Sequence, residues 1–237
     1  MKYYYDMHIH SALSPCGDKD MTPNNIVNMA IIKGLDIIAV TDHNTCGNVR
    51  AVMTAAAGRI IVVPGMEIET AEEVHVVCYF PDIEKAEAME CIIRRHLPPI
   101  ANKAEIFGNQ YYMDAEDEII GEEETLLVSA TTLDISSVFR LAKEYGGRAV
   151  PAHIDRQSYS ILANLGMIPP DLPVSAVEIT GRNREKLEID YKKYKILTNS
   201  DAHYLEDIAE PLYQIELLSK NAEDAVKYLC TLEENIL

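Results

Sequence analysis

Short β-rich runs alternate with helical stretches through most of this 237-residue chain. Between the first two runs, TPNNIVNMAIIKG predicts a helix with Thr22 as N-cap, Pro23 in the first turn and Gly34 just past the end. Such alternation is typical of a parallel β/α sheet, and seven or eight strands favour a barrel over an open sheet. The predicted strands are Tyr3–Ile9, Asp36–Thr41, Ile60–Met66, Val74–Phe80, Arg148–His153, Val174–Thr180, Lys195–Asn199 and, more weakly, Leu212–Leu217.

One segment interrupts this alternation. Residues 81–132 are too many for a single β-to-α connection, and residues 104–139 hold nine acids with neither Lys nor Arg. A charge run is usually a solvated surface, whereas a long ordered loop can serve as a lid or a partner surface. We expect a single domain over residues 1–237, with an acidic excursion at about 81–132.

The charge balance is strongly acidic, since 38 Asp and Glu against 21 Lys and Arg give −17. Because affinity for the phosphate backbone comes mostly from Lys and Arg, we expect a small phosphorylated substrate and no duplex nucleic acid. The sequence has no apolar run of membrane-spanning length and no signal-peptide pattern, so no membrane partner is expected. Five Cys without a CxxC pair favour a reducing, cytoplasmic location. The oligomeric state is left open.

Six of the seven histidines lie in or directly after a predicted strand. A barrel gathers the C-terminal ends of its strands at one mouth, so we expect these imidazoles to meet there. Packed together without a metal, they would each need a hydrogen-bond partner and would repel one another when protonated. The six are His8, His10, His43, His75, His153 and His203.

Carboxylates occupy matching positions, at Asp6, Asp42, Glu67 and Asp201. Neutral imidazole and carboxylate are the usual protein ligands of divalent transition metals. The pattern therefore predicts a multinuclear site with two to three divalent ions, for which Zn, Mn and Fe are all suitable.

Six short motifs follow one another along the chain: DMHIHS, TDHN, PGMEIE, EVHVV, PAHIDR and NSDAH. In this order, from about Tyr3 to Tyr204, they resemble the polymerase-and-histidinol-phosphatase (PHP) phosphoesterase family. The resemblance implies an α/β fold, a distorted (β/α)7 barrel, with a trinuclear metal centre at the C-terminal ends of the strands. It also implies a hydrolase that acts on phosphoester bonds.

The resemblance assigns ligands to three metal positions. The third position also needs a ligand from the loop after the first strand, where this chain departs from the family pattern. Counting back from the helix start favours Asp18 there, and a shorter loop path favours Asp20. The other ligands are His8, His10, Glu67 and Asp201 for the first metal, His75 and His153 with bridging Glu67 for the second, and His43 and His203 for the third.

Four further polar residues have expected roles around the metals. Asp6 and Asp42 are expected to orient neighbouring imidazoles, with a plain structural hydrogen bond as the alternative. Arg156 follows His153 closely enough to bind a substrate phosphate, and Arg182 could do so from the next loop. A guanidinium pairs with phosphate through two parallel hydrogen bonds, although an exposed Arg can also be a simple surface charge.

The expected reaction is hydrolysis of a small phosphorylated metabolite or nucleotide by attack of a metal-bound hydroxide on phosphorus. One alternative is a 5′–3′ exonuclease on short single-stranded oligonucleotides, which would need bases to stack on aromatic side chains. Another is a hydrolase of the amidohydrolase class, which also begins with HxH in a barrel. A fourth possibility, of another class, is a non-enzymatic metal-binding regulatory module.

Overall fold

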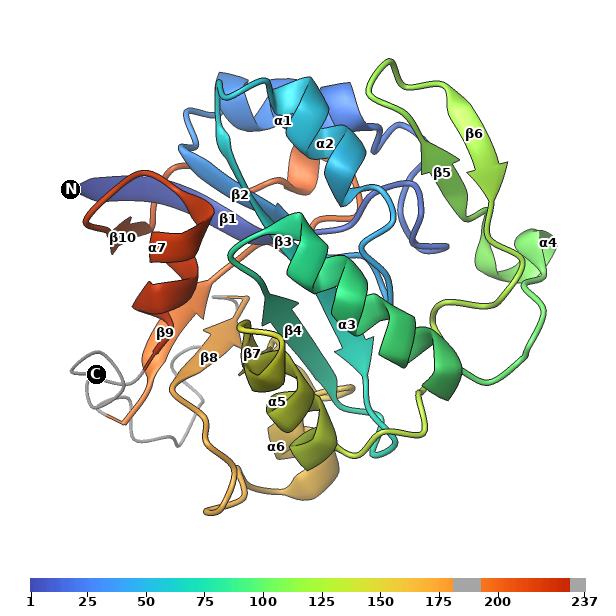
Figure 1. Ribbon diagram of the computed structural model, residues 1–237, viewed down its shortest axis with the longest axis vertical. Helices are drawn as coiled ribbons and strands as arrows, with labels where there is room; N and C mark the ends of the chain where they lie inside the picture. The colour runs from blue at the N-terminus through green and yellow to red at the C-terminus, as the bar shows by residue number, and fades with distance from the viewer. Residues whose placement is uncertain (181–192, 231–237) are drawn as a thin grey trace.

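The computed structural model describes residues 1–180 and 193–230. Its main element is a curled sheet of six strands in the order β10-β1-β2-β3-β4-β7 (Figure 1). A strand is found within each of the eight runs predicted from the sequence. The six strands are β1 (Lys2–Ile9), β2 (Ile37–Val40), β3 (Ile61–Glu69), β4 (His75–Tyr79), β7 (Arg148–Pro151) and β10 (Gln214–Glu216).

A parallel pair of strands, β8 (Ala176–Ile179) and β9 (Lys195–Thr198), continues the curl beyond β7. The segment after β9 then returns to the end of β1, where the Ala202 amide donates to the His8 carbonyl at 3.2 Å. The His10 amide in turn donates to the Ala202 carbonyl at 2.9 Å. The strands therefore surround a common interior, which is the distorted α/β barrel that was expected.

Helices cover the outer face of the sheet, and α7 closes the end of the barrel beside the start of β1 (Figure 1). The first helix begins as predicted, because the Thr22 side chain accepts from the Asn25 amide and Gly34 lies past the end with a φ of +78°. No helix in the described ranges is long and apolar enough to cross a membrane. The helices are α1 (Pro23–Ile32), α2 (Val49–Ala56), α3 (Ile83–His96), α4 (Ala104–Phe107), α5 (Ile135–Glu144), α6 (Ile161–Leu165) and α7 (Ala222–Tyr228).

A β-bulge in β1 determines where its two histidines point. The register with β2 shifts between Asp6 and Ile9. Met7 packs in the core inside the barrel, whereas Ile9, two residues later, packs in the core between the sheet and the helices. Because side chains of a regular strand alternate between faces, this change requires the extra residue of a bulge. The bulge thereby aims His8 and His10 into the mouth of the barrel.

The expectation of a parallel sheet is wrong for two strands. β4 runs antiparallel to both β3 and β7, and β10 runs antiparallel to β1. Only residues 70–74 separate β3 from β4, and so short a link permits a hairpin but not a crossover helix. As a result, His75 enters the mouth from the beginning of its strand, opposite Glu69 at the end of β3.

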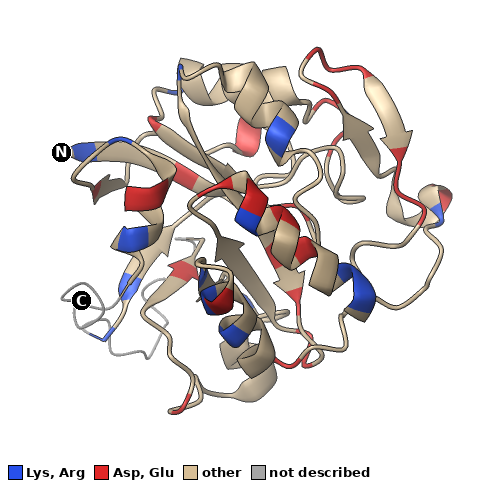
Figure 2. Ribbon diagram, viewed as in Figure 1, with Lys and Arg blue, Asp and Glu red and all other residues tan. Residues whose placement is uncertain are grey.

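The acidic excursion contains more regular structure than its sequence indicates. It starts with α3, packed on the sheet, and continues through α4 into a hairpin of β5 (Tyr111–Met113) and β6 (Ile119–Glu122). Acidic residues gather along the connection between β5 and β6 (Figure 2). The hairpin is fixed to the loop after β1, because the Tyr111 amide donates to the Ala12 carbonyl at 2.9 Å. The excursion therefore lies against a loop that leads to the mouth.

Candidate metal centre

The carboxylate of Glu67 lies at the centre of the mouth and is 1% exposed. It projects from β3 to the inner side of the barrel, on the same face of the strand as Val63. Five imidazole nitrogens lie within 3.5 Å of its two oxygens. They are His8 Nε2 at 3.3 Å, His10 Nε2 at 3.5 Å, His43 Nδ1 at 3.1 Å, His75 Nδ1 at 3.0 Å and His153 Nε2 at 3.3 Å.

Asp201 supplies a second carboxylate from the loop after β9. Its Oδ1 lies 3.1 Å from His10 Nε2 and 3.3 Å from His8 Nε2. The backbone of Asp201 is left-handed, with a φ of +54°, a conformation that is uncommon for residues other than Gly. The ligand atoms of His8, His10 and Asp201 all lie within 4.8 Å of one another, so these three residues could share one ion.

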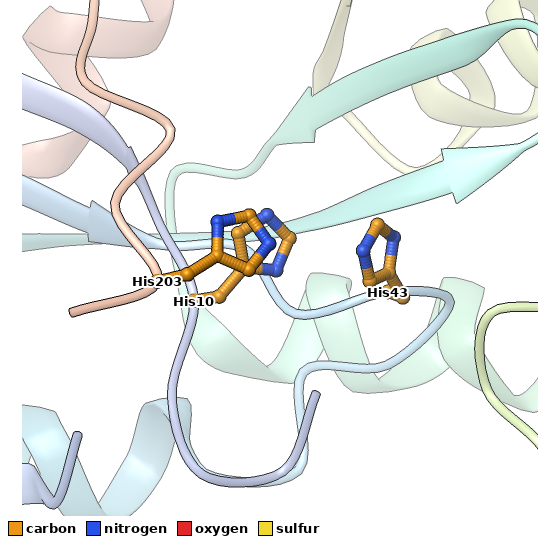
Figure 3. Close-up of side chains that lie close together, drawn as sticks. All are labelled: His10, His43 and His203. Atoms are coloured by element: carbon orange, nitrogen blue, oxygen red, sulfur yellow. The ribbon is translucent and has the colours of Figure 1, made fainter. Parts of the chain in front are cut away.

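Two further groups of potential ligands adjoin the first. His43, Glu67 and His75 form one of them, with ligand atoms within 4.8 Å of one another. His10, His43 and His203 form the other, and the ring centroids of His10 and His203 are 4.3 Å apart (Figure 3). Since His10 and His43 each belong to two groups, the positions for metal ions would be adjacent, as in a multinuclear centre.

The remaining predicted ligand, His153, completes the ring of imidazoles. Its Nε2 lies 3.3 Å from His75 Nδ1, and its backbone has a φ of +29° directly after β7. All eight His, Glu and Asp residues assigned to the metals, other than the loop carboxylate, therefore meet at one mouth.

Burial and neighbouring charges determine the protonation of this cluster. Burial lowers the pKa of His43 well below its usual value and that of His203 to about 4. For His8, burial acts in the same direction, but the carboxylates of Glu178, Asp201 and Glu67 raise its pKa well above the usual value. Because neutral imidazole is the form that binds metals, His43 and His203 are ready to act as ligands at neutral pH.

The residues at the mouth fit divalent metal ions. Despite their close neighbours, His43 Nδ1 and Glu67 Oε1 are buried and make no hydrogen bond of acceptable geometry within the described part of the chain. Leaving buried polar atoms without partners is costly, and such atoms in a native structure need an explanation. A divalent cation coordinated by both atoms would remove that cost, and mixed imidazole and carboxylate ligands suit Zn, Mn or Fe.

Glu178 on β8 is a residue of the site that sequence reasoning missed. His8 Nδ1 donates to its Oε1 at 2.8 Å, and Asn199 Nδ2 donates to its Oε2 at 2.6 Å. The His153 amide also donates to Oε1, at 3.1 Å. Such an outer hydrogen bond fixes the ring so that Nε2 would be free to bind a metal ion at the mouth. A single acid inside the apolar run AVEI was the available signal.

Asp42 affects the orientation of the His10 imidazole through the hydroxyl of Ser14. Its Oδ1 accepts from the Ser14 hydroxyl at 2.7 Å, and Ser14 Oγ lies 2.9 Å from His10 Nδ1. With its hydroxyl proton directed at Asp42, Ser14 accepts from His10 Nδ1. The second contact of Asp42, with the Ser11 hydroxyl at 2.6 Å, holds the same loop. Asp42 thus orients His10 indirectly.

Asp6 has a different environment from the one expected. Its carboxylate accepts from the Ser200 hydroxyl at 2.6 Å, the Ser200 amide at 3.0 Å and the Ala209 amide at 2.8 Å. No imidazole is among its hydrogen-bond partners in the described part of the chain. Asp6 therefore anchors the loop that carries Asp201 and His203, which is the structural alternative considered above.

The loop after β1 carries the two aspartates considered as a ligand for the third position, Asp18 and Asp20. Asp18 is tied to His203, because its amide donates to the His203 carbonyl at 2.9 Å, but its Oδ1 accepts from the Asp20 amide at 2.8 Å. Asp20 is exposed. Neither joins the three groups of potential ligands found among the described residues. Asp18 or Asp20 as a ligand stays a prediction.

Of the two arginines expected to bind phosphate, Arg156 reaches the mouth. Its Nη1 lies 2.6 Å from Asp201 Oδ2, while its side chain is 40% exposed. A cation thus stands beside the candidate metal positions and is still accessible to a ligand. Arg182 lies outside the described residues.

Comparison with known proteins supports the family resemblance. The model of the PHP domain matches residues 6–230. The chain therefore belongs to the PHP domain family, as its six motifs implied.

Two archaeal proteins of uncharacterized function are similar in sequence. Protein MJ0043 of Methanocaldococcus jannaschii is 27% identical over 190 residues, which cover 79% of this chain and 21% of that protein. Protein MJ1587 of the same organism is 37% identical over 76 residues, covering 28% of this chain and 44% of that protein. The chain thus spans less than half the length of either relative.

Solved structures share the fold at low sequence identity. The lesion-specific endonuclease Endonuclease Q from Pyrococcus furiosus has a TM-score of 0.71 and 17% identity, covering 97% of this chain and 56% of that one. A protein from Bifidobacterium adolescentis described as a metal-dependent phosphoesterase has a TM-score of 0.60 and 17% identity, covering 95% of this chain and 94% of that one.

The expectation that excluded duplex nucleic acid is wrong. An Endonuclease Q complex with a 27-mer duplex has the same fold over 96% of this chain and 56% of that one, with a TM-score of 0.67 and 18% identity. Net charge describes the whole surface, whereas a ligand responds to the local potential at the site. The value of −17 therefore gives no ground for excluding a duplex.

Proposed function

We propose that the chain is a metal-dependent phosphoesterase that hydrolyses a phosphorylated metabolite or a nucleotide with water as nucleophile. The observation that carries the proposal is the position of Glu67, whose two oxygens face five imidazoles while Arg156 stands at the adjacent Asp201. Several cation positions beside one guanidinium suit the charge that develops on a transferring phosphoryl group.

The cluster would hold two to three divalent ions, with Glu67 shared between positions. When bound, such ions supply a water of lowered pKa and neutralise charge on the phosphate oxygens. Glu178 holds the His8 ring, and Ser14 holds the His10 ring, so both Nε2 atoms stay directed into the mouth. This orientation is set before any ligand arrives.

Arg156 would bind the substrate phosphate. Its guanidinium offers five N–H donors, and among the described residues it pairs with Asp201 alone, so further donors can reach a phosphate oxygen. Because the side chain is 40% exposed, a substrate can reach it without opening the fold. Asp201 would then keep Arg156 oriented toward the bound phosphate.

A second candidate is a nuclease that cleaves a phosphodiester within or at the end of a strand. The likeness to Endonuclease Q, solved with a duplex substrate, favours including it. The same cluster serves both candidates, since a phosphomonoester and a phosphodiester present similar oxygens to the cations.

The test is release of phosphate in Mn²⁺ from AMP, a nucleoside 3′,5′-bisphosphate, ribose 5-phosphate and histidinol phosphate. Cleavage of a labelled single strand and of a duplex with an abasic site is followed on gels in parallel. His10→Ala is the inactive variant, and His96→Ala is the matched control, because His96 contacts Thr132 and belongs to none of the groups of potential ligands among the described residues.

Turnover by the wild type and by His96→Ala, with none by His10→Ala, is expected. Phosphate release would identify a phosphatase, and strand cleavage alone would favour the nuclease. No turnover of any of these substrates would contradict the proposal.

A further inference from the structure

One exposed aromatic ring lies directly on the candidate metal centre. The ring of Tyr159 stacks on that of His75, with centroids 4.8 Å apart and planes 25° from parallel. Although one face of its ring is covered in this way, Tyr159 is 46% exposed. An aromatic residue that served only to shield His75 would stabilise the fold most if its whole ring were buried. The exposed part of the ring is therefore available to a ligand.

The backbone fixes this tyrosine in place. The His75 amide donates to the Tyr159 carbonyl at 2.9 Å, so ring and main chain both contact the same histidine. Tyr159 also has a φ of +55°, a left-handed conformation that is unusual for an aromatic residue. Such strain persists only where the surroundings impose it, and it concentrates at sites that bind ligands.

Tyr159 and Arg156 belong to one loop. Tyr159 lies on the side of Glu67, and Arg156 lies on the side of Asp201. Tyr159 lies on His75, whose Nδ1 is 3.0 Å from Glu67 Oε1. Arg156, three residues earlier, pairs with Asp201. The loop between β7 and α6 thus presents a cation on one side of the candidate phosphate position and a flat apolar surface on the other.

We propose that Tyr159 is a substrate-binding residue on which the nucleobase of a nucleotide or of a strand end stacks, so that the enzyme prefers phosphoesters that carry a base. This role deepens the proposed function and rests on it. Stacking suits any base, because each base has a π face, and it contributes about tenfold or more to binding.

The experiment compares AMP with ribose 5-phosphate, which has the same phosphate and sugar without the base. The Mn²⁺-loaded wild type is expected to favour AMP in kcat/KM. Tyr159→Leu should raise the KM for AMP about tenfold and leave that for ribose 5-phosphate within twofold. Tyr159→Phe keeps the ring and should restore the preference. Tyr213→Leu is the matched control, since Tyr213 precedes β10, whose Gln214 pairs with Tyr4 near the start of β1.

The outcomes separate the two proposals. Equal losses for both substrates in Tyr159→Leu would mean that the ring only supports His75, and the inference would be overturned. If neither compound is hydrolysed, the proposed function fails for these substrates. Calorimetric titration of the same proteins with the same compounds then tests whether Tyr159 binds the base, independently of turnover. A wild type that binds AMP no better than ribose 5-phosphate would also overturn it.

Discussion

The Nδ1 atom of His8 lies 2.8 Å from Oε1 of Glu178, and both side chains are fully buried inside the barrel. Since an ionised carboxylate only accepts, Nδ1 of the ring carries a proton and Nε2 is the nitrogen that faces Glu67. The ring is thereby held with Nε2 directed at the candidate metal positions.

Replacing Glu178 should therefore weaken metal binding without removing a ligand. In Glu178→Gln, one of the two acceptor oxygens becomes a donor, so His8 and Asn199 can no longer both be satisfied. We expect a 10–100-fold loss of Mn²⁺ affinity, measured by competition with a chelating dye. Glu216→Gln, at an exposed position of β10, is the control. Unchanged affinity in Glu178→Gln would contradict the positioning role.

Removing the Ser14 hydroxyl should also weaken Mn²⁺ binding, by less than the replacement of Glu178 does. Ser14→Ala removes the link between Asp42 and His10 and leaves the imidazole free to turn. We expect a several-fold loss of Mn²⁺ affinity in the same competition assay. Ser136→Ala, at an exposed position of α5, is the matched substitution. Equal affinities in the two variants would show that Ser14 does not orient His10.

Arg156 should contribute to substrate binding and not to metal binding. Charge-assisted hydrogen bonds contribute about 1.5–3 kcal/mol, so Arg156→Ala should raise KM about tenfold or more while metal content stays unchanged. Arg140→Ala, an exposed arginine paired with Glu144 on α5, should keep the wild-type KM. A wild-type KM in Arg156→Ala would remove the phosphate-binding role.

The metal-free protein should lose stability in mild acid partly through His203. Burial holds the pKa of His203 at about 4, whereas an unfolded histidine titrates near 6.5, so the unfolded state takes up more protons as the pH falls below 6.5. Stability is therefore lost as the pH falls, by roughly 1 kcal/mol from this residue between pH 6 and pH 5.

Urea unfolding of the chelator-treated protein measures this effect. His203→Asn removes the titrating ring, so its stability should approach or exceed that of the wild type as the pH falls from 6 to 5. A constant difference between the two proteins across this interval would contradict the shifted pKa of His203.

Much of the site was predictable because strands bring distant residues to one mouth. His8, Glu67 and Asp201 come from widely separated segments, and each was expected from its place beside a strand. The bulge that aims His8 inward was not predictable, since it depends on pairing with β2. Neither was the direction of β4, which follows from a short link that the sequence pattern did not distinguish from a crossover.

Other features depended on tertiary contacts. Glu178 has no motif around it and gains its role only when β8 lies beside the end of β1. The aromatic surface of Tyr159 likewise arises from a left-handed backbone at a loop position. Asp18 was expected as a ligand from its place in the chain, and this role stays a prediction; its carboxylate accepts from the Asp20 amide of its own loop.

The central claim is that Glu67 is shared between metal positions, and elemental analysis of the bound metal tests it most directly. After loading with Mn²⁺ and dialysis, the wild type and His96→Ala should retain two to three ions per chain. Glu67→Ala should retain at most one while unfolding at a similar temperature. A full complement of metal in Glu67→Ala, or none in the wild type, would contradict the account.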